Sequence, residues 1–158
     1  MPSGKKIVYW TSGIVLLANL IILVWHLSVK QASSNFWIFV YTFVHTFSIS
    51  PQGLFSLFIY SMFTTKEAII IGHMWHVTII ICCIFMFLSN KSMYRLFISM
   101  CFLNIVAHYL NLILKFDEYL GALRASIIWI IFNPGVIFCI VCVIVLNSVS
   151  VRRALGLS

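Results

Sequence analysis

Residues 68–88 read AIIIGHMWHVTIIICCIFMFL, a run of 21 positions without a charged side chain. A helix needs about 20 apolar residues to cross the hydrocarbon core of a bilayer. Inside that core every backbone N–H and C=O group must find its partner within the segment, which favours an α-helix. The stretch therefore predicts a transmembrane helix.

Three further stretches, residues 7–27, 96–114 and 125–146, are apolar and free of Asp, Glu, Lys and Arg in the same way. The first follows Lys5 and Lys6 but lacks the short apolar region and small-residue cleavage site of a signal peptide. We therefore expect it to be a retained span, and we expect the other two stretches to cross the bilayer as helices.

Residues 36–63 are also uncharged, but Pro51 and Gly53 interrupt them. Proline removes a backbone donor and clashes with the preceding turn of a helix. The stretch is either one tilted span kinked at Pro51, or a helix followed by a re-entrant or interfacial helix that starts there. We predict the first, an all-α transmembrane bundle of five spans, with four spans as the alternative. Residues 1–158 then form a single integral membrane domain.

The composition supports this class, since 63% of the 158 residues are apolar and only 8% are charged. Soluble domains carry about 25% charged residues, and disordered chains are poor in the aromatic residues that make up 16% of this chain. The net charge of +7 comes from cations scattered at the predicted span ends. That pattern fits anionic lipid headgroups rather than nucleic acid.

The Lys and Arg residues in short loops normally set the orientation of a membrane protein. Five spans place five of these cations on each side of the membrane, whereas four spans with both chain ends inside place six against four. The charge pattern thus leans weakly toward four spans and leaves the orientation open.

A polar stripe marks residues 96–114, because Asn104, His108, Asn111 and Lys115 are spaced four, three and four apart. At 3.6 residues per turn they share one helix face. Lipid cannot satisfy such groups, so the face must meet another helix, a partner protein or a wet cavity. The predicted ligand- or partner-binding site is this stripe with the polar residues beyond it: Asn104, His108, Asn111, Lys115, Asp117, Tyr119 and Arg124.

His108 followed by Asp117, Tyr119 and Arg124 is loosely similar to the haem- and quinone-proximal segment of succinate dehydrogenase membrane anchors. The resemblance covers fewer than twenty residues, and here Glu118 separates Asp117 from Tyr119. It implies acid, phenol and guanidinium groups at the headgroup level that hydrogen-bond quinone oxygens.

Histidines occur in four of the predicted spans, where ionisable side chains tend to face the bundle interior. His45, His76 and His108 lie on three different spans at similar depth. They are therefore candidate haem ligands, with helix-stabilising hydrogen bonds as the competing interpretation.

All five cysteines lie inside predicted spans, which argues against a disulfide framework. The run from Phe138 to Cys142 resembles the membrane CxxC motif of the vitamin K epoxide reductase family, whose members are four-span proteins. The resemblance implies a thiol oxidoreductase that uses Cys139 and Cys142. That family also has a second cysteine pair in a loop, and no predicted loop here contains a cysteine.

The function favoured by the sequence is non-enzymatic. The chain lacks a soluble domain, a carboxylate deep in a span and a complete catalytic set. We expect an accessory or assembly subunit that associates laterally with other membrane proteins or with a second copy. The alternatives are a haem- or quinone-binding anchor and a thiol oxidoreductase. Asn133-Pro134-Gly135 predicts a simple kink in the last span.

Overall fold

The computed structural model describes residues 3–28, 35–49, 65–114 and 132–157, and all regular secondary structure in these ranges is α-helical. Three helices are long and apolar enough to cross a membrane. They are α1 (Ser3–Ser28), α5 (Thr65–Phe87) and α6 (Lys91–Leu114). The helical class is therefore confirmed, and three of the predicted spans coincide with helices that could cross a membrane, whereas five spans are not confirmed.

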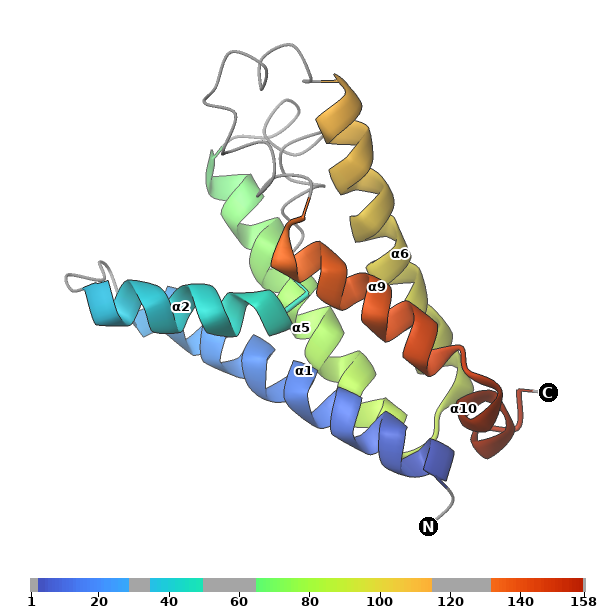
Figure 1. Ribbon diagram of the computed structural model, residues 1–158. Coiled ribbons are helices and arrows are strands. Elements are labelled where there is room, and N and C mark those ends of the chain that lie inside the picture. Colours follow the sequence, from blue (N-terminus) through green and yellow to red (C-terminus); the bar gives the residue numbers. More distant parts are fainter. Residues whose placement is uncertain (1–2, 29–34, 50–64, 115–131, 158) are drawn as a thin grey trace.

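The shorter helices are α2 (Asn35–Phe47), α9 (Pro134–Leu146) and α10 (Val149–Ala154). In the bundle α1 packs against α5, α5 against α6, and α6 against α9, while α2 and α10 lie on α1 (Figure 1). Consecutive long helices run in opposite directions, and α2 starts beside the end of α1.

The helix α2 ends at Phe47, well inside the stretch that the sequence predicts to be one span. The hydroxyl of Ser48 donates to the His45 carbonyl at 2.9 Å, and the Trp75 indole N–H donates to the Ile49 carbonyl at 2.9 Å. Ile49 is fully buried with a left-handed φ of 52°, which is strained for a β-branched residue. These contacts fix the end of α2, while Pro51 and the rest of 50–64 lie outside the described residues.

The helix α9 begins at Pro134, where the sequence predicts only a kink. Asn133 is not helical, and its side-chain oxygen accepts hydrogen bonds from the backbone N–H groups of Gly135 and Val136. Proline is favoured in the first turn, because its missing N–H would have no partner there. The correction is that these residues start a helix, and residues 115–131 before them lie outside the described part of the chain.

The end of α2 and the beginning of α9 meet inside the bundle. The rings of Phe47 and Phe138 pack edge to face at 5.1 Å, and a Cβ atom on Gly135 would lie 3.8 Å from the Thr46 carbonyl. Helix ends carry unsatisfied backbone groups, which membrane proteins tolerate at depth only where protein or a cavity covers them. Here each helix end covers the other.

Residues 3 and 157 lie at the same end of the bundle (Figure 1). At that end α10 packs on α1, and the Lys91 ammonium donates to the Gly156 carbonyl at 2.8 Å. Six cations gather there: Lys5, Lys6, Lys91, Arg95, Arg152 and Arg153. Glu67, the one acidic residue in the described ranges, lies in the first turn of α5 at the opposite end.

Gly4 should be required for the docking of α10 on α1. A Cβ atom at this position would overlap the Ser150 carbonyl, so we expect Gly4→Ala to lower stability by about 1–3 kcal/mol. Gly13→Ala is the control, because its Cβ would make an ordinary contact 3.8 Å from Phe87. It should leave stability unchanged or raise it by up to about 1 kcal/mol. Thermal unfolding in detergent micelles, followed by circular dichroism, measures both effects.

Both ends of the chain should lie on the same side of the membrane. Reporter proteins fused to each end, one active only inside the cell and one only outside, test this arrangement. The six cations predict the inner side for both ends, because Lys and Arg flanking short loops are retained there. Ends on opposite sides would contradict the arrangement and restore an odd number of spans.

Candidate functional site: a histidine cluster

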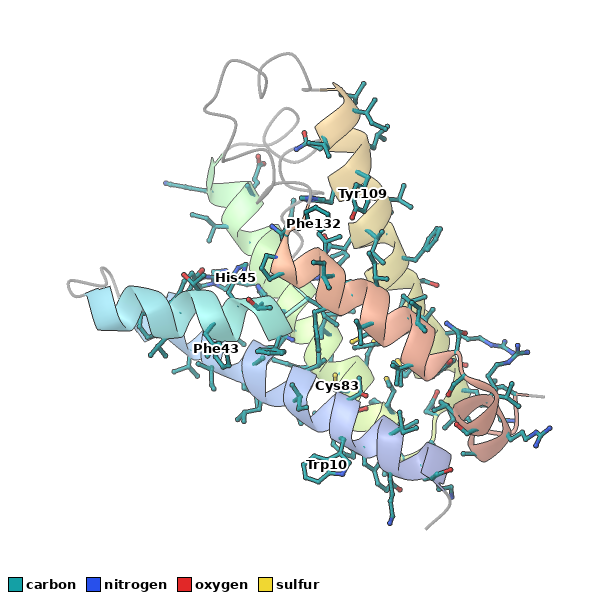
Figure 2. All side chains as sticks on the ribbon, viewed as in Figure 1. Trp10, Phe43, His45, Cys83, Tyr109 and Phe132 are labelled. Atoms are coloured by element: carbon teal, nitrogen blue, oxygen red, sulfur yellow. The ribbon has the colours of Figure 1, made fainter. Side chains whose placement is uncertain are left out.

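Histidines from three helices come together where α1, α2 and α5 meet. His26 lies near the end of α1, Tyr41 and His45 lie on α2, and His73 and His76 lie in the first half of α5. His45 projects from the opposite side of α2 to Phe43 (Figure 2). We call these five residues the histidine cluster.

Direct contacts link the members of the cluster. The Nε2 atom of His26 lies 3.0 Å from the Tyr41 hydroxyl, and the ring centres of Tyr41 and His45 are 5.4 Å apart. The His26 ring meets the rings of His73 and His76 edge-on, with ring centres 5.7 and 6.1 Å apart. His26 therefore connects the residues on α2 to those on α5.

The best-defined member is His76, which is 3% exposed. Its Nδ1 atom lies 2.8 Å from Oδ1 of Asn19, whose Nδ2 atom donates to the Val15 carbonyl at 2.8 Å. Because a carbonyl can only accept, the second bond orients the amide and leaves its oxygen facing His76. Nδ1 of His76 must then carry the hydrogen, and Nε2 is the nitrogen that can take up a proton.

The cluster extends from the end of the bundle toward its middle. His26 is exposed and closes the candidate span Ser3–His26, whereas His76 stands near the midpoint of the candidate span Lys66–Phe87. Asn19 lies seven residues before His26, about 10.5 Å along the helix axis. The site thus has a surface member and a member deep in the bundle.

Two members of the predicted polar stripe on α6 face the interior of the bundle. Asn104 and Asn111 are 3% and 7% exposed, and Nδ2 of Asn104 donates to the Cys139 sulfur at 3.6 Å. His108 is half-buried, with its ring against Tyr109. Asn104 therefore faces α9 of the same chain, while the remaining predicted residues lie outside the described ranges: Lys115, Asp117, Tyr119 and Arg124.

The candidate haem ligands are divided by the fold, because His45 and His76 belong to the cluster on α2 and α5 whereas His108 is on α6. Within the described ranges, no group of three His, Cys, Asp or Glu side chains is placed to hold a metal ion. The structure therefore brings two of the three candidate ligands into one cluster and leaves His108 outside it.

The sequence does not single out Tyr41 or Asn19 as site residues, and it marks His26 and His73 only among the histidines in general. One signal was available, since Ser12, Asn19 and His26 are spaced by seven and so share one face of α1. Ser12 and Asn19 are fully buried, which shows that this face is the packed one. No comparable periodicity connects Tyr41 to α1, because that contact joins two helices.

Comparison with known proteins adds no family, since no protein-family model, curated protein or solved structure matches the chain. The fold defines the class at a coarse level, an all-helical bundle with three helices able to span a membrane. Any function must therefore be argued from the site.

The bond between Asn19 and His76 can be tested by a double-mutant cycle. Asn19→Leu leaves a buried imidazole N–H without its acceptor, which should cost about 1–3 kcal/mol. Replacing both residues with leucine should recover much of that loss, because the unsatisfied group is then gone. Unfolding in detergent, followed by tryptophan fluorescence, gives the free energies.

Thr78→Val is the matched control, because the Thr78 hydroxyl bonds only within its own helix, to the Met74 carbonyl at 2.8 Å. It should change stability by less than the single Asn19 variant does. A double variant as unstable as the sum of the two single ones would show that the side chains are not coupled.

Proposed function

We propose that this protein is a multi-pass integral membrane protein whose activity is coupled to proton binding at the histidine cluster. Protons enter at His26, on the end of the bundle where α1 ends and α5 begins, and reach Nε2 of His76. The observation that carries the proposal is a group of four imidazoles from three helices. His26 contacts His73 and the deeply buried His76 directly, and Tyr41 links His26 to His45.

Ionisable side chains inside membrane helices are costly and mark proton or ion pathways in many membrane proteins. Imidazole is the side chain whose charge changes most readily near neutral pH. Adjacent imidazolium ions repel one another, so the cluster should bind fewer protons than it has histidines and share them between rings. Such groups titrate together rather than one by one.

The surroundings of the cluster also favour a proton as the bound species. The ionisable groups from the described helices around it are His26 on α1, Tyr41 and His45 on α2, and His73 and His76 on α5. The nearest formal charges in the described ranges, Lys66 and Glu67, lie at the start of α5. A proton needs only an imidazole nitrogen that is free to accept it, such as Nε2 of His76.

For the topology we propose four crossings, with α2 entering from the end that bears Lys66 and not crossing. Residues 3 and 157 at one end support an even number of crossings, as does the internal end of α2 at Phe47. This arrangement matches the four-span alternative from the sequence.

Histidine nitrogen NMR tests the function. The full-length protein, labelled with ¹⁵N-histidine and placed in lipid nanodiscs, is followed from pH 3 to 8, and the nitrogen shifts distinguish both neutral tautomers from the imidazolium ion. We expect His76 to carry its hydrogen on Nδ1 at high pH and to become charged in the acidic part of this range. Replacing His45 with asparagine should move the pH midpoint of the His76 titration, because the rings titrate together.

His108→Asn is the matched control, since it removes a histidine of α6 and should leave the His76 titration unchanged. A histidine that serves only to hold helices together would stay neutral across the range. If His76 keeps one neutral tautomer from pH 3 to 8, the proposed function is wrong.

We also propose lateral association with other membrane subunits, through a different surface from the one that the sequence predicts. Asn104 and Asn111, two members of the predicted polar stripe, are buried within the chain and cannot meet a partner. The outward face of α6 instead presents Phe102, Leu103 and Val106, each more than 40% exposed. Such a face suits lipid or an apolar helix of a partner protein.

A further inference from the structure

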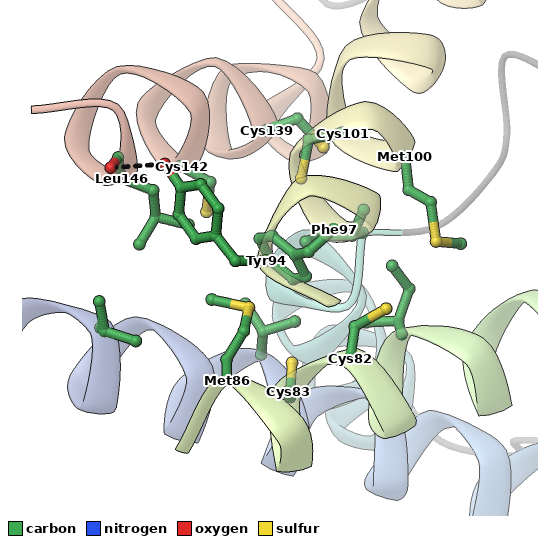
Figure 3. Packing of buried hydrophobic residues seen from close by; sticks show 14 of the residues in the cluster. Cys82, Cys83, Met86, Tyr94, Phe97, Met100, Cys101, Cys139, Cys142 and Leu146 are labelled. Carbon is green, nitrogen blue, oxygen red and sulfur yellow. Dashed lines mark hydrogen bonds between the residues drawn. The ribbon is translucent and has the colours of Figure 1, made fainter. Parts of the chain in front are cut away.

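Five thiols lie in one part of the core, where α5, α6 and α9 pack together (Figure 3). Each is at most 2% exposed: Cys82, Cys83, Cys101, Cys139 and Cys142. The histidine cluster does not involve them, so their chemistry is a separate question.

Two of these thiols, Cys101 and Cys139, lie next to each other across the α6–α9 interface (Figure 3). The Cys139 sulfur accepts a hydrogen bond from Nδ2 of Asn104 at 3.6 Å, and Asn104 lies about one helical turn after Cys101 on α6. A donor at this sulfur stabilises negative charge on it, and the thiolate is the nucleophilic form of cysteine.

The CxxC spacing favours Cys142 as the partner of Cys139, but helix geometry favours Cys101. Residues three apart on a helix have Cβ atoms about 5–6 Å apart, whereas a disulfide requires about 3.5–4.5 Å. Cys101 and Cys139 face each other from two packed helices, so they need less movement to form a disulfide.

We propose that Cys101 and Cys139 form a reversible disulfide that links α6 to α9, with a lipid-soluble quinone as the oxidant. Both S–H bonds break and one S–S bond forms. The two electrons and two protons pass to the quinone, which becomes the hydroquinone. Asn104 is a positioning residue that holds the Cys139 sulfur toward Cys101.

A quinone suits this site because the thiols are shielded from water-soluble oxidants. The outer faces of the two helices are apolar, with Phe102, Val141 and Ile144 each 46–66% exposed. An oxidant that partitions into lipid can reach this surface, and local opening of the helix pair then exposes the sulfur atoms.

The test uses the full-length protein in lipid nanodiscs with duroquinone, whose ring carbons are all substituted and cannot be alkylated by thiols. After free thiols are blocked, peptide mapping by mass spectrometry identifies the disulfide. We expect a link between positions 101 and 139, formation of one hydroquinone per link, and reversal by dithiothreitol.

Cys142→Ser is the matched control and should form the same link as the natural sequence. Cys101→Ala and Cys139→Ala should abolish it, with circular dichroism confirming that both variants keep their helices. Asn104→Leu should slow link formation about tenfold or more, if the hydrogen bond to sulfur is worth about 1.4 kcal/mol in the reaction.

Three results would overturn the proposal. One is a duroquinone-treated protein whose cysteines all stay free. Another is a link between positions 139 and 142 in place of the interhelical one. The third is a link that forms with the water-soluble oxidant diamide but not with duroquinone, because the quinone would then not be the oxidant of this site.

Discussion

The hydrogen bond between His76 and Asn19 joins α1 to α5, two of the three long helices, and orients the buried imidazole of the histidine cluster. Asn19 can hold His76 because its own amide is fixed by the Val15 carbonyl. In a low-dielectric interior an unpaired imidazole or amide would be costly, so the pair defines the relative position of α1 and α5. The same bond selects the tautomer of His76 and leaves Nε2 as the nitrogen that can take up a proton.

The helix ends inside the bundle are also stabilised by pairing polar groups that would be costly to leave unpaired. Ser48 and Trp75 bond to backbone carbonyls at the end of α2, and Asn133 bonds to backbone N–H groups at the beginning of α9. Backbone groups that lipid cannot satisfy are thus satisfied by side chains of the chain itself. The left-handed Ile49 shows that the turn is held by its surroundings rather than by local preference.

Polar groups in this bundle are sorted into two regions with different chemistry. Imidazoles gather between α1, α2 and α5, close to an exposed end, whereas thiols gather between α5, α6 and α9, away from water. We propose exchange of protons with solvent at the first region and exchange of electrons with a lipid-soluble partner at the second. Cys82 and Cys83 lie on α5, the helix that also carries His73 and His76, so α5 contributes to both regions.

From the sequence alone, uncharged runs such as 68–88 determined the helical class and three candidate spans, because crossing hydrocarbon is a local requirement on each segment. The stripe of Asn104 and Asn111 likewise showed which face of α6 must be covered. Neither signal says which element covers that face of α6, because the answer depends on packing between segments far apart in the chain. Only the tertiary structure brought Tyr41 to His26, Asn19 to His76 and Cys101 to Cys139. Those pairings depend on how the helices pack together, which no periodicity within a single helix encodes.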